Sequence, residues 1–180
     1  MKRKYLILIL ILILVVGCKN MKDTPTSHVE NFMSKYQKLD SEVLNQLDMI
    51  VANRLDLTDS QKEKYRNLME RQYQDMTYKI KDEVSDDNHA TVTISVLVYD
   101  YQSAINKSEE HYNKNKEEFQ KEDGSIDIEK YWDYKISEMT KVEDKKENEI
   151  VFTLHKDKNK WVLDDVSDSD REKLHGVYNG

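Results

Sequence analysis

The feature that most constrains this chain is an apolar run at residues 5–16, which follows three basic residues and ends just before Cys18, the only cysteine. A membrane-spanning helix needs about 20 apolar residues, so this run is too short to be one. A basic start followed by a short apolar stretch is typical of an export signal that is removed from the mature protein. We therefore expect residues 1–17 to be cleaved and exclude them from the predicted fold.

The run ends in Val15, Val16, Gly17 and Cys18, which resembles the lipobox of bacterial lipoproteins. In that motif, small or aliphatic residues fit the signal peptidase, and the cysteine thiol receives a diacylglyceryl group before cleavage between Gly17 and Cys18. The resemblance implies that residues 18–24 form a lipidated tether, held by its acyl chains at the extracytoplasmic face of the cell membrane. A plain transmembrane anchor with an idle cysteine is the alternative. In either case, one cysteine allows no disulfide within the domain.

Charge limits the partners of the rest of the chain. The formal net charge is −7, and residues 2–4 carry three positive charges, so the chain without its first 17 residues carries −10. Because an acidic surface repels nucleic acid and anionic headgroups, we expect no nucleic-acid binding and attachment to the membrane through acyl chains alone. The charged residues, 35% of the total, alternate with periodic apolar residues, unlike the pattern of disordered chains. One folded domain is expected over residues 25–180.

Helices are predicted first. Thr24 and Pro25 supply an N-cap and a first helical residue, and apolar residues follow at spacings of three and four to Ile50. Asp40 supplies a second N-cap, so this segment is either one rod or two helices with a corner. A capping box at residues 58–61 starts another helix, which ends near residue 76. From residue 77 the period changes to two, which predicts a hairpin with its turn at residues 85–88.

The second half of the chain predicts a polar helical hairpin at residues 102–146, interrupted near Gly124 and carrying thin apolar stripes that include Ile128. Strands follow at residues 150–154 and 161–163. A last short helix is capped by Ser167 or Ser169 and ends near Gly176. The predicted fold class is therefore α+β, with helices first, an antiparallel sheet of about four strands, and a helical hairpin inserted between the two strand pairs.

This order of elements resembles small bacterial lipoproteins with a cystatin-like, or nuclear-transport-factor-like, fold. The resemblance covers most of residues 24–166 and is most specific at the lipobox, the helix start Thr24-Pro25-Thr26 and the strand Lys160-Trp161-Val162-Leu163. It implies a single domain in which a curved antiparallel sheet wraps the N-terminal helices, with residues 102–146 as an insertion that departs from the family pattern. Members of the group are mostly uncharacterised, and the fold hosts enzymes, ligand binders and interaction modules, so it selects no function.

No motif for catalysis, a metal or a cofactor emerges from the residues. Four glycines cannot build a phosphate- or dinucleotide-binding loop, and none of the five histidines has a second histidine at metal-ligand spacing. The acidic cluster at residues 164–170 lacks the glycine and distal glutamate of a calcium loop, and its Ser and Asp residues suit a helix cap. We therefore expect no metal, no cofactor and no catalytic residue.

Five side chains remain as a candidate pocket, because they lie at strand ends or on strand faces: Tyr99, Asp100, Tyr101, His155 and Trp161. An acid–base pair among them, at the open side of a cone-shaped sheet, would resemble the proton-transfer sites that this fold supports in isomerases. The competing interpretation is that the aromatic side chains simply pack on the sheet.

The expected function is that of a membrane-anchored extracytoplasmic lipoprotein, acting as a non-enzymatic binding or accessory component of the cell envelope. Its partner would be an envelope protein or a small ligand. One alternative is an enzyme that uses Asp100, Tyr101 or His155 as acid–base groups. A second alternative is an assembly module in which the hairpin of residues 102–146 docks a partner.

Overall fold

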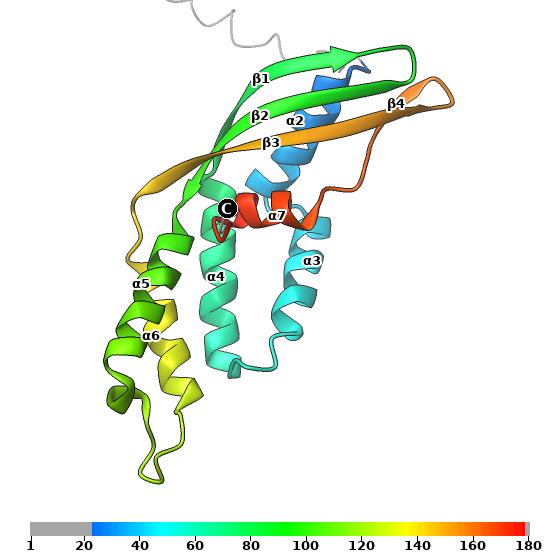
Figure 1. The fold of residues 1–180 in the computed structure, drawn as a ribbon. Helices are drawn as coiled ribbons and strands as arrows, with labels where there is room; N and C mark the ends of the chain where they lie inside the picture. Colours follow the sequence, from blue (N-terminus) through cyan, green and yellow to red (C-terminus); the bar gives the residue numbers. More distant parts are fainter. Residues whose placement is uncertain (1–22, 179–180) are drawn as a thin grey trace, which may run out of the picture.

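The structure, a computed structural model, describes residues 23–178. Within this range, six α-helices, one short 3₁₀-helix and a four-stranded antiparallel sheet confirm the predicted α+β class (Figure 1). The helices are α2 (Pro25–Gln37), α3 (Ser41–Ala52), α4 (Asp59–Asp75), α5 (Tyr101–Lys114), η1 (Lys116–Phe119), α6 (Ile128–Thr140) and α7 (Asp168–His175). The strands are β1 (Thr77–Ser85), β2 (His89–Tyr99), β3 (Lys145–Asp157) and β4 (Lys160–Leu163).

The predicted signal, its cleavage site at Gly17 and Cys18, and all but the last two tether residues lie outside the described residues. Among residues 23–178, no helix is long and apolar enough to cross a membrane.

The N-terminal segment forms two helices with a corner, which settles the choice that the sequence leaves open. Thr24 and Ser27 make a reciprocal capping box at the start of α2. Leu39 then adopts a left-handed conformation with φ of 51°, and the Asp40 side chain accepts a hydrogen bond from the backbone N–H of Glu42 to cap α3. Because a new helix begins at this corner, the apolar stripe of α3 does not continue that of α2.

The sheet follows the chain order β1-β2-β3-β4, and each strand is antiparallel to its neighbour. It bends over α2 and α7, which cover one of its faces (Figure 1). Alternate residues of β2 supply the centre of the core and are fully buried, together with two side chains of α2: Val29, Met33, Val92, Ile94, Val96 and Val98. The other face of the sheet is open and carries the partly exposed Leu97, Val151 and Val162.

The connection between β2 and β3 is the predicted helical hairpin, formed by α5, η1 and α6. The predicted insertion extends to residue 146, but β3 begins at Lys145, five residues before the predicted strand start. The reason is register: the polar residues at the start of β3 pair with the last residues of β2, from Lys145 opposite Tyr99 to Glu149 opposite Ser95. Strand pairing provides hydrogen bonds for their backbone groups even though the side chains face solvent. The sequence therefore has no apolar pattern that predicts this part of the strand.

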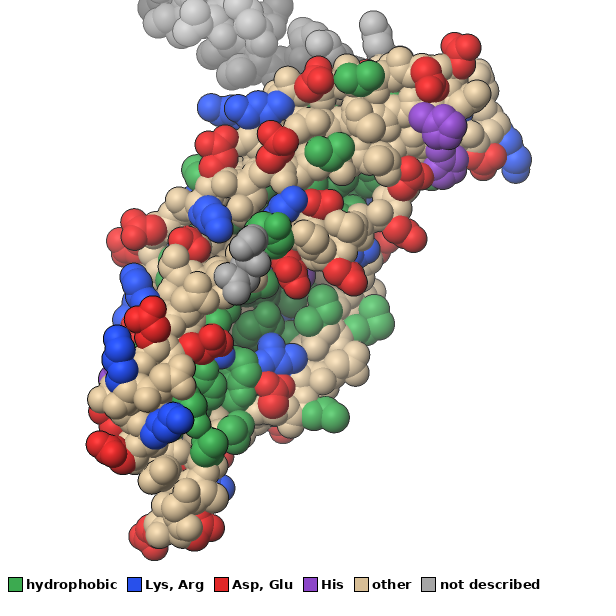
Figure 2. All heavy atoms as spheres, viewed as in Figure 1, with side chains coloured by type: hydrophobic (Ala, Val, Ile, Leu, Met, Phe, Trp, Pro, Cys, Tyr) green, Lys and Arg blue, Asp and Glu red, His purple; other side chains and the backbone are tan. Residues whose placement is uncertain are grey.

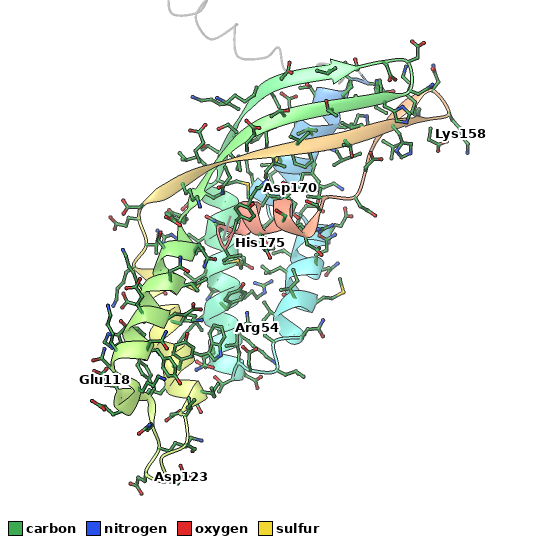
Figure 3. All side chains as sticks on the ribbon, in the orientation of Figure 1. Arg54, Glu118, Asp123, Lys158, Asp170 and His175 are labelled. Carbon is green, nitrogen blue, oxygen red and sulfur yellow. The ribbon has the colours of Figure 1, made fainter. Side chains whose placement is uncertain are left out.

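The molecule is elongated, with a sheet end and a helical end. The described chain begins at the sheet end, where the backbone N–H of Trp161 donates to the Asp23 carboxylate at 3.4 Å. The β3–β4 turn at Lys158 lies at this end, whereas the α5–α6 connection at Asp123 lies at the far tip of the helical end (Figure 3). Acidic and basic side chains are interspersed over the visible surface between the two ends (Figure 2).

Candidate functional site

The five candidate pocket residues fall into two groups at opposite ends of β2. His155 pairs with His89 at the first residue of the strand, whereas Tyr99 is its last residue and pairs with Lys145. At about 3.3 Å per residue, the 11-residue strand separates the two groups by roughly 30 Å. The five side chains therefore do not line one cavity, and the predicted grouping is wrong in this respect. The sequence could not show this separation, because it places both groups at strand ends without showing which strand ends are neighbours.

The first group consists of Tyr99 and Tyr101, which stack with ring centroids 5.8 Å apart at the junction of β2 and α5. The hydroxyl of Tyr99 donates to Asp75 at 2.7 Å, and the hydroxyl of Tyr101 donates to the carbonyl of Leu68 at 3.2 Å. Burial raises the pKa of Tyr101 to about 12, so this phenol is poorly suited to proton transfer near neutral pH. Both rings are buried packing elements, which agrees with the competing interpretation of their role.

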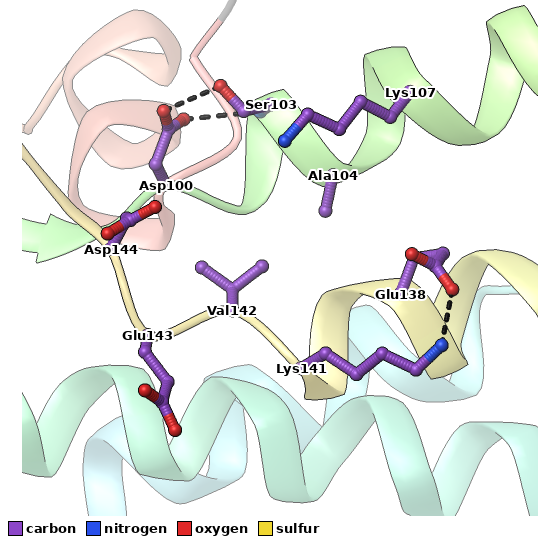
Figure 4. A pocket seen from close by; sticks show the side chains of 9 residues that line it. All are labelled: Asp100, Ser103, Ala104, Lys107, Glu138, Lys141, Val142, Glu143 and Asp144. Atoms are coloured by element: carbon purple, nitrogen blue, oxygen red, sulfur yellow. Dashed lines mark hydrogen bonds and ion pairs between the residues drawn. The ribbon is translucent and has the colours of Figure 1, made fainter.

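Asp100 lies between these tyrosines and caps α5. Its carboxylate accepts hydrogen bonds from the backbone N–H of Ser103 at 3.2 Å and from the Ser103 hydroxyl at 2.6 Å. The same carboxylate borders a cavity of about 420 Å³ between α5 and the end of α6 (Figure 4). The other lining residues include Lys107, Glu138, Lys141, Glu143 and Asp144. This is an open, mixed-charge cavity, and its Asp100 is already occupied by helix capping.

The second group lies at the sheet end. His155 Nδ1 contacts Asp164 Oδ1 at 2.6 Å, and hydrogen bonds from Thr153 and then His155 lower the pKa of Asp164. Asp164 and Thr153 also border an open hollow of about 490 Å³ with His89. The ring of Trp161, in contrast, is buried and lies 4.8 Å from the ammonium group of Lys156, so it packs on the sheet rather than facing this hollow.

The helical end carries a set of stacked cations that the sequence reasoning missed. The guanidinium of Arg54, just after α3, lies 4.6 Å from the Trp132 ring of α6 and 5.4 Å from the Tyr65 ring of α4. The buried Lys135 ammonium also lies 4.6 Å from the Trp132 ring, and it is 3.3 Å from Glu109. Arg54 thus connects the turn after α3 to α4 through Tyr65 and to α6 through Trp132, and Lys135 connects α6 to Glu109 of α5.

Large apolar side chains are exposed beside this stack. On α3 and the turn that follows, Met49 is 60% exposed, Ile50 is 43% exposed and Leu55 is 90% exposed. The prediction that Ile50 lies on a buried stripe is wrong, because α3 buries Val43, Leu47 and Val51 instead. Ile128, predicted on the buried stripe of α6, is also largely exposed. A usable sequence signal was the run Met49-Ile50-Val51, since three consecutive apolar residues exceed what one helix face can bury.

Comparisons with known proteins add no relative: no family model, no curated protein and no solved structure matches this chain significantly. Among residues 23–178, no three or more His, Cys, Asp or Glu side chains are arranged to hold a metal ion. The exposed apolar side chains of the helical end, beside the stacked Arg54, are the candidate functional site, on the strength of their exposure and of this geometry.

Proposed function

We propose that the protein is a membrane-anchored extracytoplasmic lipoprotein that acts as a non-enzymatic binding or accessory component of the cell envelope. The observation that carries the proposal is the lipobox-like run at residues 15–18 ahead of a domain that exposes large apolar side chains, among them Leu55 at 90%, at the end opposite Asp23. Acyl chains on Cys18 supply the membrane attachment, and the helical end supplies the contact surface.

The geometry supports this division of roles. Asp23 is the fifth residue after Cys18, and an extended chain spans at most about 3.6 Å per residue, so the sheet end lies within roughly 18 Å of an acylated Cys18. For a chain held there, the sheet end faces the membrane and the helical end points away from it (Figure 1). The candidate surface is then presented to partners outside the headgroup region.

We further propose that the domain belongs to the cystatin-like fold. Support comes from α2 lying against one face of a bent four-stranded meander, and from the position of the α5–α6 hairpin as an insertion between β2 and β3. A solved structure in which α2 leaves the sheet uncovered would contradict this part of the proposal.

The enzymatic alternative has weaker support from the geometry. Its three acid–base candidates are divided between the two ends of β2: Asp100 caps α5, Tyr101 is buried, and His155 pairs with Asp164 at the sheet end. General acid–base catalysis needs two titratable groups within hydrogen-bond reach of one substrate. The hairpin alternative is also weakened, because α5 and α6 share contacts with α4, among them the Gln61 side-chain amide that donates to the Glu129 carbonyl at 2.8 Å.

Membrane anchoring is tested by detecting the covalently attached lipid on Cys18. Cells that express the full chain are grown with a clickable palmitate analogue, and the N-terminal peptide of the purified protein is identified by mass spectrometry. We expect the label and a diacylglyceryl group on Cys18, with no peptide from residues 1–17. Cys18→Ser should abolish the label and retain the leader, whereas the neighbouring Lys19→Ala, as a matched control, should leave both processing and label intact. An unlabelled wild-type chain that starts at Met1 would overturn the proposal.

A further inference from the structure

Two histidines that are 66 positions apart in the sequence, His89 and His155, lie directly opposite each other in the sheet. His89 is the first residue of β2, and His155 lies near the end of β3. Directly opposite residues of an antiparallel pair point their side chains to the same face. Histidine side chains gather at this end of the sheet in Figure 2. Spacing along the chain gives no sign of the pair, because the register of two distant strands creates it.

The hydrogen bonds beside this pair show that its two side chains are close together. The backbone N–H of Lys156 donates to the carbonyl of Asn88 at 2.8 Å, so Asn88 and Lys156 are a hydrogen-bonded pair of the ladder. Hydrogen-bonded and non-hydrogen-bonded pairs alternate along an antiparallel ladder, so the next pair, His89 and His155, is a non-hydrogen-bonded one. The Cα atoms of such a pair are only about 4.5 Å apart. Two imidazoles at this separation can reach one ion.

A carboxylate lies near the Nδ1 atom of each imidazole. Nδ1 of His155 lies 2.6 Å from Oδ1 of Asp164, and the pKa of that carboxyl is lowered, so it is ionised near neutral pH. An ionised carboxylate only accepts hydrogen bonds, so Nδ1 of the neutral His155 ring is the donor and Nε2 keeps its lone pair. Nδ1 of His89 lies 3.9 Å from Oδ1 of Asp86, an atom that accepts hydrogen bonds from two backbone N–H groups at the β1–β2 turn.

The surroundings of the pair suit a cation. Imidazoles that bind metal ions are commonly oriented by a carboxylate at the ring nitrogen that does not bind the ion, which is the arrangement of His155 and Asp164. His89 also borders the open hollow of about 490 Å³ at this end of the sheet. Among the described residues, those that line the hollow include Asp86 and Asp164 but no lysine or arginine. The negative charge attracts a cation, and the hollow leaves space for its bound water.

We propose that Nε2 of His89 and Nε2 of His155 bind one divalent transition-metal ion, such as Zn²⁺, across β2 and β3. Imidazole suits such ions, whereas Mg²⁺ and Ca²⁺ prefer oxygen ligands. The two rings are fewer than the three protein ligands of a catalytic zinc site, so water completes the coordination on the side of the hollow. The site is independent of the proposed function, because it needs no acyl chain on Cys18.

Zn²⁺ binding is measured by isothermal titration calorimetry on the full chain, which carries no affinity tag and has been treated with a chelator. The chain is held in phosphatidylcholine nanodiscs, and empty nanodiscs are the reference. We expect one Zn²⁺ to bind per chain, whereas Mg²⁺ should not bind. The absence of Zn²⁺ binding would overturn the proposal. Equal affinities for Zn²⁺ and Mg²⁺ would also overturn it, since they would indicate carboxylate ligands.

Substitutions locate the ion. Both histidines are exposed, so His89→Gln and His155→Gln should leave the fold intact, and each should weaken Zn²⁺ binding at least tenfold by removing one ligand. Asp164→Asn should weaken binding several-fold, because it removes the charge that orients the His155 ring. His111→Gln is the matched control: His111 also pairs with a carboxylate, that of Glu118, but lies at the helical end. This variant should bind Zn²⁺ as the wild type does, and a loss equal to that of His89→Gln would contradict the site.

Nuclear magnetic resonance of the histidine nitrogens identifies the ligand atoms. Zn²⁺ should shift the Nε2 resonances of His89 and His155 together and leave those of His111 unchanged. A shift at only one of the two histidines, or a larger shift at Nδ1 of His155 than at its Nε2, would overturn the proposal. Failure of Cys18 labelling with retained Zn²⁺ binding would overturn the membrane anchor alone, so the two proposals fail separately.

Discussion

The sheet end and the helical end of this protein bury their side chains in different ways. In the sheet, four alternate residues of β2 and their partners on α2 are fully buried, and this mainly aliphatic core also holds Phe152 of β3 against Phe32 of α2. In the helical end, α4, α5 and α6 are joined through aromatic rings and stacked cations, while large apolar residues remain exposed. From this difference we expect the sheet to be the more stable region and the helical end to tolerate residues that serve contact rather than folding.

The two regions meet at Gly176, which ends α7. Its φ is +72°, and its carbonyl accepts a hydrogen bond from the backbone N–H of Gln102 at 2.8 Å. A Cβ at this position would overlap the carbonyl oxygen of Tyr99 and the side-chain amide of Gln72, which itself bonds both backbone groups of Tyr99. Gly176 therefore holds α7, α4, β2 and α5 in contact.

The largest expected effect follows from this junction. Gly176→Ala should lower the free energy of unfolding by about 4 kcal/mol, because it combines overpacking with a strained backbone conformation and breaks hydrogen bonds. Denaturant titration with two probes, one in each region, measures it. Gly124→Ala at the tip of the helical end is the control: φ is +80° but no atom lies within 4 Å, so the cost should be about 1 kcal/mol. Equal costs at the two glycines would mean that the close contacts of Gly176 do not stabilise the junction.

A second substitution tests the sheet core directly. Ile94→Ala should cost about 3 kcal/mol, since it opens a cavity at a fully buried position. The neighbouring Thr93 points to the open face, and Thr93→Ala should cost less than about 0.5 kcal/mol. If Ile94→Ala were as mild as its control, the sheet would not be the more stable region.

A third prediction concerns stability at low pH, and it involves His175, the residue before Gly176 at the junction. Burial lowers the pKa of His175 to about 4, and its Nε2 lies 3.0 Å from the Tyr73 hydroxyl. Above pH 6.5 the imidazole is neutral in both states, and stability is fully present. Between pH 6.5 and 4, the imidazole of His175 binds a proton in the unfolded chain but not in the folded chain. The free energy of unfolding should therefore fall by about 2 to 3 kcal/mol as the pH is lowered through this range.

Because other groups titrate in this window, the measurement is a difference between two proteins. The pH dependence of urea unfolding is compared for the wild type and His175→Gln, and the variant should show a shallower loss between pH 6.5 and 4. Identical slopes would mean that His175 is protonated in the folded protein at these pH values.

The smallest effect is expected at the helical end. Arg54→Ala removes two stacking contacts and an exposed ion pair, which together should contribute about 1 kcal/mol. The loss should be local: hydrogen exchange should accelerate in the first turns of α4 and α6 but stay unchanged in β2. The control is Lys62→Ala, since this partly exposed lysine of α4 has no carboxylate partner among residues 23–178 and only a long 3.5 Å hydrogen bond to the Ala52 carbonyl. Faster exchange in β2 would show that the two regions are not independent.

The sequence predicted the fold where local chemistry decides it. Thr24, Asp40, Thr58 and Ser167 cap their helices as their side-chain types indicate, and the alternating residues of β2 face the core. The class and the strand number followed from these signals.

What the sequence missed depends on contacts between distant segments. The early start of β3 comes from pairing with β2, and charged residues such as Lys145 carry no signal of it. The candidate pocket residues separate into two groups because of the register of β2 against β3. The periodicity of the sequence does not give this register. The stacking of Arg54 on Trp132 joins residues 78 positions apart, so only the packed structure could reveal it.

The length of β3 has a mechanical consequence. The strand has 13 residues and therefore extends about 40 Å, from the base of the α5–α6 hairpin to the sheet end, with β2 bonded along most of it. A flexible linker of the same length would let the helical end move freely relative to the sheet end, whereas a paired strand is a stiff spacer. For a chain acylated at Cys18, the spacer fixes a standoff of several tens of ångströms, which selects partners that extend well beyond the lipid headgroups.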